Sequence, residues 1–73
     1  MDRFIFSSSK LCRIMAFAGV GNAGLAKRTG LSYECVYKIS SGKVGDPGVK
    51  TLFAIADALD VPVQYLMALE ESD

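Results

Sequence analysis

The sequence contains no histidine and no tryptophan, and it has only two cysteines and two prolines. Histidine is the commonest general base and metal ligand, so its absence argues against most hydrolases and metalloenzymes. The two thiols, Cys12 and Cys35, are too few for a disulfide scaffold and cannot complete a tetrahedral zinc site. We therefore expect a protein that is not an enzyme and that holds no metal or cofactor.

A long apolar run is also missing. No segment approaches the ~18 to 20 apolar residues of a membrane span, and the N-terminus lacks the layout of a signal peptide. Hydrophobic residues still make up 51% of the 73 residues, which is enough for the core of one small domain. These features predict a cytoplasmic protein without a membrane partner.

Positive charge is absent from the C-terminal third of the chain. All eight lysines and arginines lie in residues 1–50, where three acidic residues oppose them and leave a charge of +5. Residues 51–73 hold five acidic residues, so the whole chain is neutral. This asymmetry indicates one surface suited to a polyanion and another facing away from it. A folded dipole without a partner is the alternative.

The spacing of apolar residues predicts a compact all-α domain of five helices. Ser7 or Ser9 can cap the first helix, and strand-like alternation is confined to the segment Phe4-Ile5-Phe6. The chain divides into an arm, a helical domain and an acidic tail, at residues 1–8, 9–69 and 70–73. The first helix is expected from this cap to about residue 17. The others are expected at residues 22–29, 33–41 and 49–59, and from residue 63 onward.

The predicted core consists of the apolar residues that these helices turn inward. They are Leu11, Ile14, Met15, Leu25, Ala26, Leu31, Val36, Ile39, Leu52, Ile55, Ala56, Leu59 and Leu66.

The segment from Gly19 to Gly24 matches the dinucleotide-binding pattern G-x-G-x-x-G. A dinucleotide site needs a strand before this pattern and a βαβ unit around it. Here the pattern follows apolar residues at helical spacing. A bend between two helices is therefore the better interpretation of these glycines.

Residues 25–39 carry the most informative pattern. Ala26 is small where two helices must approach closely, and Gly30 follows four residues later at the turn. Leu31 fills the angle between the helices, and Ser32 can cap the second one. Together, at this spacing, these residues indicate a helix-turn-helix.

The chain resembles the lambda-repressor-like, Cro-type helix-turn-helix family, also called the XRE family, from about residue 10 to residue 66. The resemblance implies a five-helix domain of bacterial, phage or mobile-element origin that binds operator DNA as a dimer. Where the family often has Gln, Arg and Glu, this chain has Asn22, Met15 and Ser40. The matching residues are Leu25-Ala26, Gly30-Leu31-Ser32, Val36, Ile39, Gly42, Pro47, Leu52, Ile55-Ala56, Ala58-Leu59, Val61 and Leu66.

The helix at residues 33–41 is the expected recognition helix. Successive residues of a helix are rotated by ~100°, so Val36 and Ile39 define its inward side. Glu34, Tyr37, Lys38 and Ser41 then point outward, and Tyr33 lies at the edge of the outward side. Glutamate can accept a hydrogen bond from cytosine N4, and lysine can donate to guanine. The base-contacting residues implied by the family positions and by this orientation are Tyr33, Glu34, Tyr37 and Lys38.

Two simpler interpretations of this helix remain open. Glu34 and Lys38 are spaced i, i+4 and can form an ordinary ion pair worth ~0.2 to 0.5 kcal/mol, and Tyr37 can be a half-exposed aromatic residue. Phosphate contacts would set the register on DNA. The candidates for them, some of which can equally belong to a solvated surface, are Asn22, Lys27, Arg28, Ser41, Lys43 and Lys50.

The sequence therefore predicts a transcriptional regulator, a repressor that occludes operator DNA as a homodimer with residues 33–41 in the major groove. The alternative is a protein-interaction module or antitoxin of the same fold with weak or no DNA binding. Zero net charge and the missing family Gln and Arg favour that alternative. Its protein partner would bind residues 1–8 or 63–73.

Two segments are candidates for the dimer interface. The arm Arg3-Phe4-Ile5-Phe6 can act as an added strand or a swapped hook, or it can staple onto the first helix through Phe6 and Leu11. The predicted fifth helix is the favoured candidate because it is more apolar than a small core requires. Its interface residues would be Val63, Tyr65, Leu66, Met67 and Leu69.

Overall fold

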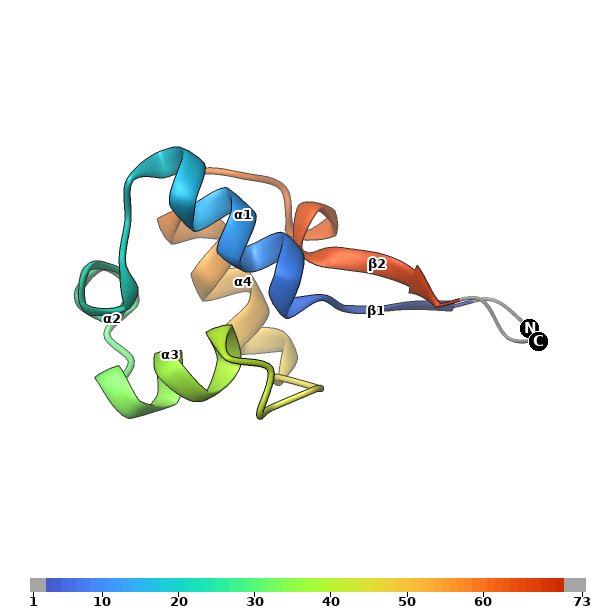
Figure 1. The fold of residues 1–73 in the computed structure, drawn as a ribbon, viewed down its shortest axis with the longest axis horizontal. Helices are drawn as coiled ribbons and strands as arrows, with labels where there is room; N and C mark the ends of the chain where they lie inside the picture. The colour runs from blue at the N-terminus through green and yellow to red at the C-terminus, as the bar shows by residue number, and fades with distance from the viewer. Residues whose placement is uncertain (1–2, 71–73) are drawn as a thin grey trace.

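A computed structural model describes residues 3–70. The four helices form one body, and the two strands project from it as an antiparallel ribbon (Figure 1). No helix within residues 3–70 is long and apolar enough to cross a bilayer. The elements in chain order are β1 (Arg3–Phe6), α1 (Ser8–Ala18), α2 (Asn22–Thr29), α3 (Tyr33–Ser40), α4 (Val49–Ala58), the 3-10 turn η1 (Val63–Leu66) and β2 (Met67–Glu70).

The helix boundaries follow from local capping chemistry. Ser7 is the N-cap of α1, and its hydroxyl accepts a hydrogen bond from the backbone N–H of Lys10 over 3.2 Å. At the other end, Gly19 takes the left-handed conformation, with φ of 72°. The predicted boundaries of α2 are confirmed, and α3 and α4 each end one residue earlier than predicted.

The prediction of a fifth helix, and with it of an all-α fold, is wrong. Residues 63–66 make a single 3-10 turn, and the chain then enters β2. Val63 and Leu66 have the i, i+3 spacing of a helix, but one turn already buries Leu66 completely. Beyond it, pairing with the distant N-terminal segment supplies the backbone hydrogen bonds that a helix would have made.

The ribbon joins the two ends of the described chain. Phe6 lies opposite Met67, and Phe4 lies opposite Leu69. The backbone N–H of Ser7 donates to the carbonyl of Leu66 over 2.9 Å, which continues the pairing up to the helical body. The arm thus forms a strand, and this strand pairs within its own chain, with the segment predicted to be helical.

The core lies between the helices and the base of the ribbon. Every residue predicted for it is either buried or packed against it. Two further core residues, Phe6 and Val20, were not predicted, and both are about nine-tenths buried. Fully burying a leucine side chain stabilises a fold by about 1.5–3 kcal/mol. The leucines without exposed surface are Leu11, Leu25 and Leu66.

Candidate nucleic-acid interface

The turn between α2 and α3 is built from short-range hydrogen bonds. Gly30 ends α2 with φ of 80°, and its N–H donates to the carbonyl of Ala26 over 2.9 Å. The hydroxyl of Thr29 accepts from the N–H of Leu31 over 3.2 Å. Ser32 then caps α3, accepting from the N–H of Cys35 over 3.1 Å. These contacts fix the angle at which α3 leaves α2, as a helix-turn-helix requires.

The two sides of α3 differ in exposure. Val36 is fully buried and Ile39 is 2% exposed, so these two residues attach the helix to the core. The four side chains expected to contact bases all lie on the exposed side, and they are Tyr33, Glu34, Tyr37 and Lys38. The structure therefore brings this predicted set together on one solvent-facing surface.

Glu34 and Lys38 form an ion pair along this surface. Lys38 Nζ lies 3.2 Å from Glu34 Oε1, and the side chains are 50% and 76% exposed, respectively. Because both groups face solvent, the pair contributes little to stability. Its two partners therefore remain accessible to hydrogen-bonding groups on another molecule.

The Tyr37 ring contacts the ammonium of Lys43, just beyond the C-terminal end of α3. The ammonium of Lys43 lies 5.4 Å from the centroid of the Tyr37 ring, which is a cation–π contact. The ring is half-exposed, and the Lys43 side chain is exposed. Tyr37 thus orients Lys43 beside the predicted recognition surface, a relationship that spacing alone did not reveal.

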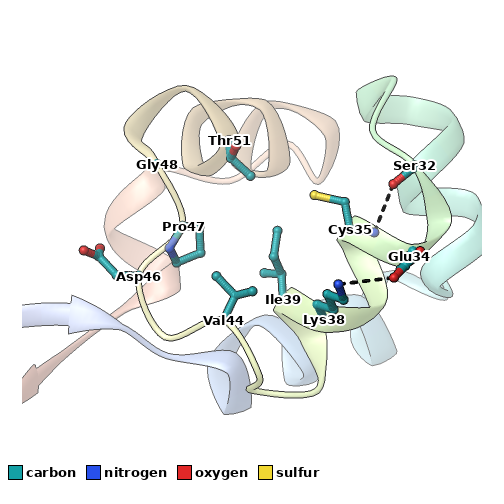
Figure 2. A pocket seen from close by; sticks show the side chains of 10 residues that line it. All are labelled: Ser32, Glu34, Cys35, Lys38, Ile39, Val44, Asp46, Pro47, Gly48 and Thr51. Carbon is teal, nitrogen blue, oxygen red and sulfur yellow. Dashed lines mark hydrogen bonds and ion pairs between the residues drawn. The ribbon is translucent and has the colours of Figure 1, made fainter.

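A hollow of about 500 Å³ adjoins α3, where Cys35, Ile39, Val44 and Pro47 approach one another (Figure 2). Its lining contains the carboxylates of Glu34 and Asp46 but a single cation, Lys38. This balance does not favour an anion such as phosphate.

Asn22 is fixed at the N-terminus of α2 by α3. The hydroxyl of Ser40 donates to Asn22 Oδ1 over 3.0 Å, which turns the amide N–H₂ group away from Ser40. Ser40 was not predicted as a site residue. Asn22 and Ser40 are two of the positions that depart from the family pattern, and their joint departure was the signal that could have identified the contact.

The remaining phosphate candidates occupy different parts of the surface. Lys27 on α2 and Lys50 in the first turn of α4 are exposed. The Ser41 hydroxyl donates to the carbonyl of Lys38 over 3.3 Å. Arg28 Nη1 donates to the carbonyl of Ala58 over 3.4 Å, so this guanidinium lies at the C-terminal end of α4. The structure therefore does not gather all the predicted phosphate ligands into one cluster.

The residues predicted for the dimer interface divide into two groups. Leu66 is fully buried, so its side chain belongs to the core of its own chain and is not available to a partner. Tyr65 and Leu69 are about half-exposed, while Val63 and Met67 pack against the core. The predicted acidic tail lies outside the described residues, apart from the backbone of Glu70.

A helical body in which a capped turn presents an exposed second helix defines a helix-turn-helix domain. The model of the Cro/C1-type HTH DNA-binding domain family matches residues 7–72, and the chain belongs to this family. The family resemblance deduced from the sequence is thereby confirmed. No curated protein matches the chain significantly.

Proposed function

We propose that the chain is a sequence-specific repressor that binds operator DNA as a homodimer, with α3 in the major groove. Repression would follow from occlusion, because a protein seated across a promoter excludes polymerase from the same DNA. The observation that carries the proposal is the two-sided nature of α3. Val36 and Ile39 hold the helix in the core, and its polar and aromatic residues face solvent.

Each exposed residue of α3 has a chemical role in this proposal. Lys38 donates to guanine O6 or N7, and Glu34 accepts from cytosine N4. Tyr33, which is 57% exposed at the helix N-terminus, packs on a thymine methyl or donates to a phosphate. Tyr37 lies on the same exposed side of α3, and its ring holds the ammonium of Lys43 in place.

Phosphate contacts flank the recognition helix in this proposal. The amide N–H₂ of Asn22 and the ammonium groups of Lys43 and Lys50 are the principal donors. Lys27, Arg28 and Ser41 are weaker candidates, since the hydrogen-bonding groups of Arg28 and Ser41 already contact backbone carbonyls. Such contacts fix the register of the protein on DNA without selecting its sequence.

A second candidate function is a protein-interaction module or antitoxin of the same fold. The Glu34–Lys38 pair favours it, because it leaves the outer surface of α3 without net charge from these two residues. The two functions differ in salt dependence. Binding through phosphates weakens steeply with salt, whereas binding through an apolar interface hardly responds.

The test is selection of bound duplexes from a random-sequence pool, followed by titration of the selected duplex at several salt concentrations. We expect one sequence to be enriched, and log affinity to fall with a slope of about −0.9 per phosphate neutralised. A scrambled duplex of the same length is the control. Equal binding to selected and scrambled duplexes, or a flat salt dependence, would exclude sequence-specific DNA binding.

A further inference from the structure

A groove lies between the β1–β2 ribbon and α1. It has a volume of about 560 Å³, which is within the range of hollows that bind small molecules. Within residues 3–70 its lining comes from β1, α1, η1 and β2, and no residue of α2 or α3 contributes to it. The groove is therefore separate from the surface proposed to contact DNA.

The walls of the groove are predominantly apolar. Phe4 of β1 is 69% exposed and Tyr65 of η1 is 54% exposed, and these residues supply two aromatic rings. Ile14 and Met67 add aliphatic surface and are themselves partly buried against the core. An apolar group seated among these side chains would remove their exposed surface from water, which favours binding.

Both charged residues that line the groove within the described chain are cations. Lys10 and Arg13 lie one turn apart on α1, so their side chains share a face of the helix. Lys10 Nζ donates to the carbonyl of Met67 over 2.6 Å, which fixes the ammonium beside β2 and leaves its other N–H donors for a ligand. Arg13 is exposed. Since none of the described lining residues is acidic, the positive charge of the groove is not balanced from within it.

We propose that the groove binds a small amphipathic anion, an apolar molecule that ends in a carboxylate. The carboxylate accepts hydrogen bonds from Lys10 and from Arg13, whose guanidinium presents paired N–H donors that match carboxylate geometry. The apolar body of the ligand lies against Phe4, Tyr65 and Met67. The two cations favour an anion over a neutral molecule, and the apolar walls favour it over an inorganic ion. The inference goes beyond the proposed function and does not depend on it.

Such a ligand would join two parts of the molecule. Its carboxylate would be held by α1, and its apolar body would contact the ribbon and η1. A ligand that binds only the folded chain raises the free energy of unfolding. Thermal unfolding therefore gives a measure of binding that is independent of DNA.

The test is isothermal titration calorimetry of the full chain with decanoate, below the concentration at which decanoate forms micelles. We expect one molecule bound per chain and a melting temperature that rises with decanoate concentration. Each methylene removed from the chain of the ligand should weaken binding about fourfold, which is the contribution of a buried methylene. Decanol lacks the charge and acetate lacks the apolar body, so these matched controls should each bind about tenfold more weakly or less tightly still.

Two variants locate the ligand in the groove. Arg13→Gln should weaken decanoate binding about tenfold or more, the loss typical of a hydrogen bond between charged groups. Phe4→Ser should weaken it by removing part of an apolar wall. Both side chains are exposed, so the variants should keep the wild-type circular dichroism. Lys27→Gln and Phe17→Ser are the matched controls, because these exposed residues lie outside the groove, and they should bind decanoate as the wild type does.

The proposal is overturned if the wild-type chain does not bind decanoate, or if it binds decanol equally tightly. It is also overturned if Arg13→Gln and Phe4→Ser leave the affinity for decanoate unchanged. A chain that binds decanoate as expected but selects no DNA sequence would overturn the proposed function alone. A chain that selects a DNA sequence but does not bind decanoate would overturn this inference alone.

Discussion

The Ser40 hydroxyl donates a hydrogen bond to Asn22 Oδ1 over 3.0 Å and thereby joins the end of α3 to the start of α2. The contact uses the side-chain carbonyl oxygen of Asn22 and leaves the N–H₂ group as a donor at the N-terminus of α2. The backbone N–H groups of the first turn point in the same general direction. This arrangement suits a DNA phosphate, and it makes the orientation of Asn22 depend on Ser40.

Replacing Asn22 with aspartate should separate DNA binding from stability. Asp keeps the acceptor for Ser40 and places negative charge at a helix N-terminus, which stabilises a helix by about 0.3–1 kcal/mol. It also removes the amide donor and repels phosphate. We expect an unchanged or higher melting temperature, together with about tenfold weaker binding to selected and random duplexes alike, measured by fluorescence anisotropy.

Ser40→Ala is the companion variant to Asn22→Asp. It removes the hydroxyl that orients the amide but leaves the amide donor in place, so it should weaken binding less than Asn22→Asp does. If Asn22→Asp binds DNA as tightly as the wild type, Asn22 does not contact a phosphate.

Lys38 should determine sequence preference. Lys38→Ala removes a donor to a guanine edge, and we expect a loss of about 1–3 kcal/mol on the selected duplex, concentrated at one base pair. Glu34→Gln is the informative partner variant, because it breaks the ion pair and keeps the side-chain length. An equal loss on selected and scrambled duplexes would show that Lys38 contacts the backbone instead.

Lys50 should contribute to DNA affinity without contributing to sequence preference. Its side chain is exposed in the first turn of α4, and it is proposed to contact phosphate. Lys50→Ala should weaken binding to every duplex similarly and should reduce the salt slope by about 0.9 for each protomer bound. A Lys50→Ala variant with an unchanged slope would place this residue outside the DNA contact.

The helix-turn-helix was predictable from sequence because its determinants are local. Gly30, Ser32 and the inward pair Val36 and Ile39 lie within ten residues, so capping and periodicity specify α3 without reference to the rest of the chain. The surface of α3 followed directly, because the burial of two residues fixes the direction of the others.

The ribbon was not predictable from sequence in the same way. Phe6 and Met67 are far apart in the chain, and the pattern around Leu66 also fits one turn of a helix. The choice between helix and strand depends on a tertiary pairing that local propensity does not encode. The contacts of Asn22 with Ser40 and of Lys43 with Tyr37 likewise depend on how two segments are placed, not on spacing within one of them.

The last prediction concerns the turn itself. Gly30 has φ of 80°, and a methyl group added there would meet no atom within 4 Å, so any cost of Gly30→Ala comes from the backbone alone. The left-handed conformation costs a residue with a Cβ about 1–2 kcal/mol, equivalent to a melting temperature lower by roughly 4–8 °C per kcal/mol in a domain of this size. Gly45→Ala is the matched control, since a Cβ at Gly45 also meets open space and that residue is absent from the positive-φ glycines. It should leave the melting temperature unchanged or raise it, because alanine restricts the unfolded chain. Thermal unfolding followed by circular dichroism measures both variants, and equal melting temperatures would show that Gly30 does not hold the turn through its conformation.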